Sequence, residues 1–417
     1  MQPSALLILS AYILVTAFGY WLRFINLRHL KQHGAEIPSG FEEAIDPELL
    51  RKSSAYTFEQ SKLGLWESFL DNGMLLLFLF GGLLPLYDAW ISTFTGSFVI
   101  NNLLFLLVLS FASSLLHMPF SLYGTFRIEN RFGFNRMTFQ LWLSDLFKST
   151  LIGLVLSAVV GGGALMLVAW SPGYWWLWVW CFFALVSLFL MYLSPVVIEP
   201  LFNKFEPVKD DDLKGEIVAL MERGGLKVGT VLQVDASRRS GHSNAYFTGI
   251  GRVKRIVLYD TLLEQMSHGE VLAVLAHEVG HWKKGHIWKR LAATEAVALL
   301  VCFLAHLLIS HDVLPGLFGL SQASFGAQLL LLGFLGSLAG FPLTPLGSWI
   351  SRRHEWQADR YGAALSGMPE ELASALIKLS KENLANLHPH PLYAKFCYSH
   401  PPVVERVRRL RRLRSGC

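Results

Sequence analysis

Charged side chains are scarce in this sequence of 417 residues: they make up 16%, whereas hydrophobic residues make up 53% and the mean hydropathy is +0.40. This balance lies outside the range of ordinary water-soluble domains, so it excludes a simple soluble globular protein. Cysteine is also rare, and the spacing of the four cysteines fits neither a disulfide framework nor a cysteine metal site. The sequence also lacks an Asn-x-Ser/Thr acceptor for N-glycosylation.

Long hydrophobic runs account for this composition. A helix needs about twenty apolar residues to cross a bilayer, and seven runs reach roughly that length. One such run could be a buried core helix, but seven predict a membrane protein with seven spans. The predicted spans are about Ala5–Trp21, Leu65–Leu86, Phe98–Phe120, Thr150–Trp170, Trp175–Leu193, Ala292–Ser310 and Ala327–Ile350.

The distribution of Lys and Arg between the spans predicts the orientation. The connections after the first and the third span are rich in Lys and Arg, whereas residues 1–4, 87–97, 171–174 and 311–325 contain none. Because cytoplasmic loops carry the excess of Lys and Arg, we expect the N-terminus outside and the C-terminus inside. The long insert at about 195–290 and the tail from Ser351 are then both cytoplasmic.

The motif His277-Glu278-Val279-Gly280-His281 predicts a metal site. Residues four apart lie on the same face of a helix, so the two imidazoles can bind a single ion. Imidazole nitrogen is a favoured ligand of Zn²⁺, and a catalytic zinc keeps one position open for water. Glu278 is then placed to accept a proton from that water as it attacks a carbonyl. We expect one Zn²⁺ per chain.

The helix that carries this motif has clear boundary signals. Ser267 and Glu270 are spaced as a capping box, in which each side chain bonds the backbone of the other residue. Lys283, Lys284 and Gly285 follow the motif, and basic residues and a glycine favour the end of a helix.

Two histidines leave the zinc one protein ligand short. Glu355 and Asp359, just after the last predicted span, are four apart on a predicted helix, so one can bind zinc while the other accepts a hydrogen bond from a ligand imidazole. We expect Glu355 to be the ligand and Asp359 its partner. His354 is the competing ligand. The alternative is an exposed helix end at which Arg352 and Arg353 contact the membrane surface.

Six segments of the chain, in this order, match one known family: Glu129–Asn135, Glu199–Phe205, His242–Phe247, the zinc helix, Glu355–Asp359 and Ser399–Arg406. In these segments the chain resembles the type I CAAX prenyl proteases, integral-membrane zinc metalloproteases related to the HtpX proteases. The resemblance implies seven helices that enclose an intramembrane chamber, a zinc site on its cytoplasmic side, and cleavage of peptides near a prenylated C-terminus. The tail ends without an endoplasmic-reticulum retention signal, which favours a bacterial inner membrane.

The same resemblance suggests substrate-binding residues. Asn244 lies between two strand-like segments, and an edge strand above a zinc helix can pair with an extended peptide. The alternative for Asn244 is a turn position between strands. His400 and Arg406 match family residues near the cleaved peptide, where a cation can hold the substrate backbone or the oxyanion. Arg406 is also one of six arginines within residues 406–414, a run that favours a membrane-surface or solvated face.

Together these features predict a mainly α-helical, polytopic membrane protein with a zincin-like, gluzincin-type catalytic region. We expect four segments: spans 1–5 in 1–194, the insert with edge strands and zinc helix in 195–290, spans 6–7 in 291–350, and the C-terminal region in 351–417. The expected partners are a peptide or protein substrate, prenylated or similar, and the lipid bilayer, with no nucleic acid.

Two other functions stay open. An HtpX-like protease would cut unprenylated membrane proteins as part of quality control. A seven-span transporter with a structural zinc would also accommodate polar residues within the spans, such as Glu67, Asp71 and Glu295. The Glu355 and Asp359 pair disfavours the transporter, because structural zinc sites usually fill all four positions with His or Cys.

Overall fold

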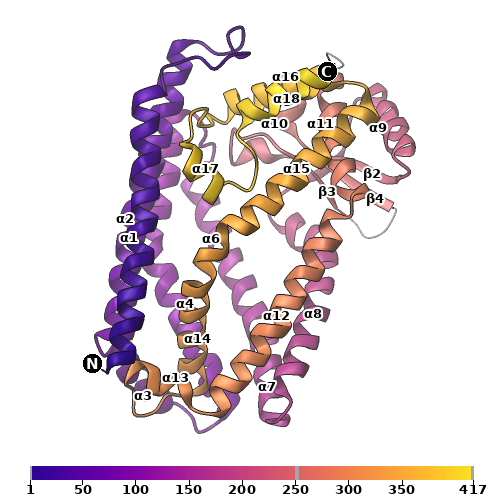
Figure 1. Ribbon diagram of the computed structural model, residues 1–417. Coiled ribbons are helices and arrows are strands. Elements are labelled where there is room, and N and C mark those ends of the chain that lie inside the picture. Colours follow the sequence, from indigo (N-terminus) through magenta and orange to yellow (C-terminus); the bar gives the residue numbers. More distant parts are fainter. Residues whose placement is uncertain (1, 249–252, 415–417) are drawn as a thin grey trace.

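The computed structural model describes residues 2–248 and 253–414. Long helices run side by side through the lower two thirds of the molecule, and a region of shorter helices and a small sheet lies at one end of them (Figure 1). The first turn of α1 lies at the opposite end of the long helices from this region, and α18, the last helix, lies within it.

Among the described residues, seven helical stretches are long and apolar enough to cross a membrane, which confirms the predicted number of spans. They are α1 (Pro3–His33), α2 (Pro47–Phe80), α4 (Phe98–Tyr123) with its extension to Phe132, α6 (Phe139–Leu156) with α7 (Gly162–Trp170), α8 (Trp175–Leu193) with its extension to Leu201, α12 (His286–Ser310), and α14 (Phe325–Gly340) with α15 (Thr344–Ser366).

Two of the predicted spans contain a break in the helix that hydropathy did not predict. The second stops at Phe80, because Gly82 takes a left-handed conformation with φ of 84° and starts the separate helix α3 (Leu83–Ser92). The seventh is interrupted by a single 3₁₀ turn at Phe341–Leu343, and α15 then continues well past Ile350. Hydropathy does not register either change of direction, since the residues on both sides of each break are apolar.

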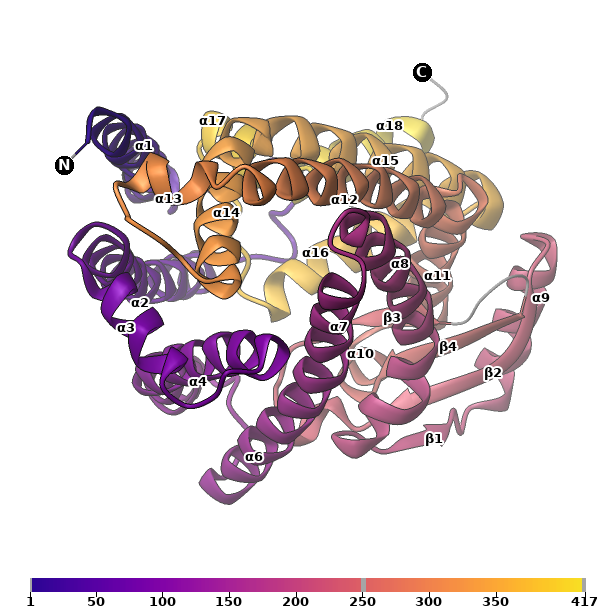
Figure 2. The same ribbon diagram turned by 90° about the horizontal axis from the view of Figure 1, so that it is seen from below.

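The membrane-capable helices form a ring when they are viewed along their axes (Figure 2). Their most apolar windows are buried to only 6–17% inside the molecule. Few residues of these helices are therefore fully covered by other parts of the protein, as is expected for a ring with an outer face toward lipid. The short helices α3 and α13 (Val313–Phe318) lie at the end of the ring where α1 begins.

A four-stranded sheet forms part of the insert at 195–290, within the described residues. Its order is β1-β2-β4-β3, so β3 lies at one edge and pairs antiparallel with β4, while β2 and β4 are parallel. Short helices α9 (Asp211–Arg223) and α10 (Asp260–Gln265) flank the strands. The strands are β1 (Phe205–Pro207), β2 (Lys227–Val234), β3 (Ala245–Thr248) and β4 (Val253–Tyr259).

One hydrophobic core joins this insert to the C-terminal region. Ile217 of α9, Ile256 of β4, and Leu275 and Val279 of α11 (His268–Lys283) pack in the same cluster as Ala375 of α16. All five are fully buried. The remaining C-terminal helices are α16 (Pro369–Glu382), α17 (Pro391–Cys397) and α18 (Val403–Arg414).

Helices α11 and α15 approach each other unusually closely, and glycine makes this possible. A Cβ at Gly280 of α11 would lie 2.8 Å from the Cα and the carbonyl oxygen of Ala358, and a Cβ at Gly362 of α15 would lie 2.7 Å from the backbone nitrogen of His277. Because these neighbours are backbone atoms, they cannot move aside without separating the helices. The two glycines therefore set the distance between the helix with the His-Glu-x-x-His motif and the helix with Glu355.

We predict that Gly362→Ala forces α11 and α15 apart. Overpacking of this kind typically costs about 1–3 kcal/mol, so the thermal unfolding temperature of the detergent-solubilised protein should fall, and bound zinc should fall with it. Gly347→Ala is the matched control, because it lies on the same helix with nothing within 4 Å of its added Cβ. Unchanged unfolding and zinc content in Gly362→Ala would contradict the proposed contact.

Candidate active site

The zinc-motif helix α11 begins with the predicted capping box. The Ser267 side chain accepts from the backbone nitrogen of Glu270, and Glu270 accepts from that of Ser267. Glu270 also accepts hydrogen bonds from Lys378 Nζ at 2.7 Å and Ser374 Oγ at 2.6 Å, both on α16. Burial would raise the pKa of Glu270, but these hydrogen bonds outweigh it and hold the pKa below its usual range. The start of α11 is thus tied to the C-terminal region.

His277, His281 and Glu355 converge on one point. Each offers one nitrogen or oxygen ligand atom, and these atoms lie within 4.8 Å of one another, close enough to bind a single metal ion. We call these three residues the metal-type cluster. The Nε2 atoms of the two histidines are 3.2 Å apart. Glu355 places one carboxylate oxygen 3.6 Å from His277 Nε2 and the other 3.3 Å from His281 Nε2.

The Glu355 carboxylate carries a further sign of a metal site. Its Oε2 atom is buried yet makes no hydrogen bond to a protein group, which is costly for a buried oxygen. A cation between Oε2 and the two imidazoles would satisfy it. His354, the competing ligand, lies outside this cluster and stacks on His286 at 4.0 Å instead.

Asp359 lies behind His277, as the i,i+4 spacing predicts. Its Oδ1 atom is 2.8 Å from His277 Nδ1, so it can accept the Nδ1 proton and leave Nε2 facing the cluster. Arg406 of α18 donates two hydrogen bonds to the same carboxylate, at 2.9 and 2.6 Å. Burial would lower the pKa of Arg406, but Asp359 and Glu355 outweigh it and raise the pKa.

Arg406 does not lie on the membrane-surface or solvated face that the run of arginines favoured. Its side chain is buried, with 7% of its surface exposed, whereas a membrane-surface or solvated face would leave it open. The run forms one amphipathic helix, in which Val407 and Leu410 pack inward beside Arg406. Residue type alone could not separate Arg406 from the five arginines that follow it.

Glu278 and His400 are the other predicted residues of the centre, and they differ in exposure. Glu278 follows His277 on α11 and is partly buried. His400 places Nε2 3.4 Å from the Glu355 carboxylate, and 64% of its side chain is exposed. The His400 side chain can therefore reach a molecule that approaches from solvent.

The predicted edge strand is present as β3, which packs against α11. Asn244 precedes it and is exposed, but its side-chain oxygen accepts from the next backbone nitrogen, at Ala245, at 2.8 Å. This local hydrogen bond is the one expected of an Asn at a turn, which was the alternative for Asn244. The Tyr246 hydroxyl on β3 donates to Glu199 at 2.7 Å, which ties the strand to the end of the fifth span.

A polar network that the sequence reasoning missed links the segments Glu129–Asn135 and His242–Phe247. His242 contacts the Glu129 carboxylate at 3.4 Å and Asn383 at 2.8 Å, and Tyr56 of α2 donates to Glu129 at 2.6 Å. The hydrogen bond to Glu129 raises the pKa of His242. The network joins a membrane helix, the loop before β3 and the end of α16, so the two segments have a structural role in positioning the strand.

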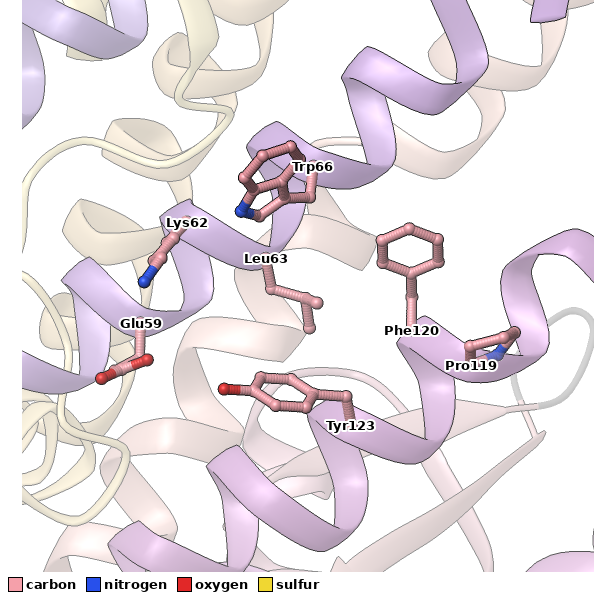
Figure 3. A pocket seen from close by; sticks show the side chains of 7 residues that line it. All are labelled: Glu59, Lys62, Leu63, Trp66, Pro119, Phe120 and Tyr123. Atoms are coloured by element: carbon pink, nitrogen blue, oxygen red, sulfur yellow. The ribbon is translucent and has the colours of Figure 1, made fainter.

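A cleft of about 380 Å³ lies between α2 and α4 (Figure 3). Its walls are mainly aromatic and aliphatic, with one acidic and one basic residue at one end. None of the residues of the metal-type cluster lines it, so it is not the catalytic centre. The lining residues are Glu59, Lys62, Leu63, Trp66, Pro119, Phe120 and Tyr123.

Comparison with known proteins gives matches over nearly the whole chain. Residues 26–204 match the family described as CAAX prenyl protease N-terminal, five membrane helices, and residues 207–414 match peptidase family M48. The crystal structure of Ste24p from S. mikatae superposes with a TM-score of 0.90 at 31% identity, covering 98% of this chain and 99% of that one.

Curated relatives agree with this. CAAX prenyl protease 1 of Saccharomyces cerevisiae is 34% identical, with 97% of this chain and 94% of the relative covered. The Arabidopsis thaliana homologue is 35% identical over 89% of each chain. The chain therefore belongs to peptidase family M48 and, within it, to the CAAX prenyl proteases.

Proposed function

We propose that this protein cleaves peptide bonds near the prenylated cysteine of CAAX-type substrates, and that His277, His281 and Glu355 hold its zinc ion. The observation that carries the proposal is the convergence of two imidazole nitrogens and one carboxylate from two tightly packed helices. The names of the relatives, CAAX prenyl protease 1, support the substrate class.

The donor set fits a catalytic zinc better than a structural one. Two histidines and one carboxylate occupy three positions and leave the fourth for water and substrate, as in other zinc peptidases. The buried Glu355 Oε2 without a hydrogen bond supports a cation at this point. When bound, zinc supplies Lewis acidity, which activates water and polarises the scissile carbonyl.

The protein's own residues have distinct tasks in this proposal. Glu278 accepts the proton of the attacking water at its carboxylate and then donates it to the leaving amine. Asp359 holds His277 in the tautomer that presents Nε2 to the metal, and Arg406 holds Asp359 through two hydrogen bonds. Since Arg406 is buried and bonded to Asp359, we assign it this supporting role in addition to the predicted one near the substrate.

The substrate would bind where the cluster is open. An extended peptide can add to the edge of β3 through backbone hydrogen bonds, beside α11. His400, which is exposed and close to Glu355, would then contact the peptide near the cleaved bond. Asn244 would contribute its side-chain amide at the start of the same strand.

We also propose that the insert at 195–290 and the region 351–417 fold together around the metal, on the cytoplasmic side, with the N-terminus outside. Support comes from the shared core of α9, α11 and α16 and from the position of α1 at the far end of the spans. The distribution of Lys and Arg between the spans supports this orientation in the membrane. The enclosed chamber and the bacterial inner membrane rest on the resemblance and on the sequence alone.

Glu278→Gln should remove the base without removing the metal. We expect peptide cleavage to fall by at least ~10²–10⁴-fold, the usual contribution of general acid–base catalysis, while zinc content and thermal unfolding stay unchanged. His277→Ala is the control, because it should lose zinc and activity together. Zinc-loaded, folded Glu278→Gln that cleaved at a near wild-type rate would disprove the proposed mechanism.

The substrate class can be tested with one CAAX peptide in farnesylated and unfarnesylated form. With purified protein, we expect mass spectrometry to locate cuts near the modified cysteine of the farnesylated peptide, at a much higher rate than in the other form. Equal cleavage of both would favour the HtpX-like quality-control protease. Transport of intact cargo without any cleavage would favour the transporter.

The topology can be tested with single cysteines in a cysteine-free background. Ser92 and Arg238 are both exposed, so we expect a membrane-impermeant thiol reagent to label Ser92→Cys in intact cells and to label Arg238→Cys only after permeabilisation. Labelling of Arg238→Cys in intact cells would reverse the proposed orientation.

A further inference from the structure

The two histidines of the metal-type cluster have different partners at their outer nitrogens. His277 Nδ1 faces the charged carboxylate of Asp359 at 2.8 Å. His281 Nδ1 instead faces the ring of another histidine: His286 Nδ1 lies 3.1 Å away. On its other side His286 Nε2 lies 2.9 Å from Gln357 Oε1. The mechanism proposed above uses neither His286 nor Gln357.

We propose that His286 is a positioning residue of the metal centre, which accepts the Nδ1 proton of His281 and donates its own Nε2 proton to Gln357. The inference rests on the ligand set proposed above. Its direction follows from the chemistry of imidazole: a neutral ring has one donor and one acceptor nitrogen. If His281 binds the metal through Nε2, its Nδ1 must carry the proton. His286 Nδ1 must then accept, so His286 Nε2 is protonated and needs an acceptor.

Gln357 provides that acceptor, since its carbonyl oxygen faces His286 Nε2. The opposite arrangement, with His286 donating to His281, would put the proton of His281 on Nε2 and block metal binding. Only one direction of these hydrogen bonds is therefore compatible with metal binding: His281 donates to His286, and His286 donates to Gln357. This chain of hydrogen bonds performs for His281 the task that Asp359 performs for His277, but with neutral groups.

The fold holds His286 firmly in this position. Gly285 takes a left-handed conformation with φ of 66°, which turns the chain between α11 and α12 and brings the first residue of α12 back against His281. His286 is 4% exposed, and its ring stacks on His354 with an interplanar angle of 11°. The outer partner of a metal ligand is thus the first residue of the sixth membrane-capable helix.

The test measures zinc affinity by competition with a chelator, in the full-length purified protein. His286→Leu fills much of the space but cannot accept a hydrogen bond, so we expect zinc affinity to fall about 10–100-fold, as for other outer partners of metal ligands. His286→Asn can place an oxygen near the Nδ1 position and should restore most of the affinity. His354→Phe keeps the ring stack and should bind zinc as the wild type does.

A second readout separates positioning from general stability. Visible absorption of the cobalt-substituted protein reports ligand geometry, so we expect it to change in His286→Leu and not in His286→Asn or His354→Phe. If His286→Leu does not fold, the exposed Gln357 gives the same test: Gln357→Leu should weaken zinc binding, and Gln357→Glu, which keeps an acceptor, should not.

Two results would overturn the inference. Equal zinc affinity in His286→Leu, Gln357→Leu and wild type would show that these residues do not hold the Nδ1 proton of His281. Equal losses of affinity in His286→Leu and His286→Asn would show that His286 only fills space. A wild type without zinc at His277, His281 and Glu355 would overturn the proposed function and this inference together. If only the inference about His286 is wrong, the wild type still binds zinc at the cluster, and only the His286 and Gln357 variants depart from the expected results.

Discussion

The contact between α11 and α15 is the constraint on which the rest of the site depends. Gly280 and Gly362 let the backbones approach so closely that a single methyl group at either position would meet backbone atoms. This approach places Glu355 against His277 and His281. Since α15 follows α14 after only one 3₁₀ turn, Glu355 is attached directly to the membrane-capable part of the chain. The cluster of His277, His281 and Glu355 therefore joins the insert to the spans.

Buried charge at the centre is only partly balanced by the protein's own groups. Glu355, Asp359 and Arg406 are all buried, and charges without partners would be costly there. Arg406 donates two hydrogen bonds to Asp359 and places Nη1 3.5 Å from Glu355 Oε2, so one cation faces two carboxylates. The remaining negative charge fits a bound cation at the cluster. Because Arg406 comes from α18, the last helix also contacts the residues around the cluster. The C-terminal region thus packs against the cluster at both α15 and α18.

The sequence predicted those features that depend on local spacing. The number of spans, the capping box at Ser267, the shared face of His277 and His281, and the i,i+4 pair of Glu355 and Asp359 all follow from helical periodicity or hydropathy. The assignment of metal and substrate roles to these residues stays a prediction, although the structure brings them together.

Features that depend on contacts between distant segments could not be predicted in the same way. Gly362 looks like any glycine in a helix until the helix against it is known. Arg406 is separated from Asp359 by 47 positions and resembles its neighbouring arginines. His286 offered a weak signal, a histidine directly after the glycine that ends the zinc helix, but its meaning depends on the turn at Gly285. The breaks at Gly82 and Phe341 were invisible to hydropathy.

A substrate with a lipid attached near the cleaved bond places opposite demands on one site. The peptide bond needs water and polar groups, while the isoprenoid is stable only next to apolar surface. The structure meets both conditions at one end of the ring of helices: β3 and the cluster lie in the polar region, and α12 and α15 lead from that region into the spans (Figure 1). In the most apolar windows of the spans only 6–17% of the residues are buried, so most of this apolar surface is not covered by other parts of the protein. The cluster takes Glu355 from α15, and the first residue of α12 contacts His281, so the cluster is attached to the two helices that border both environments.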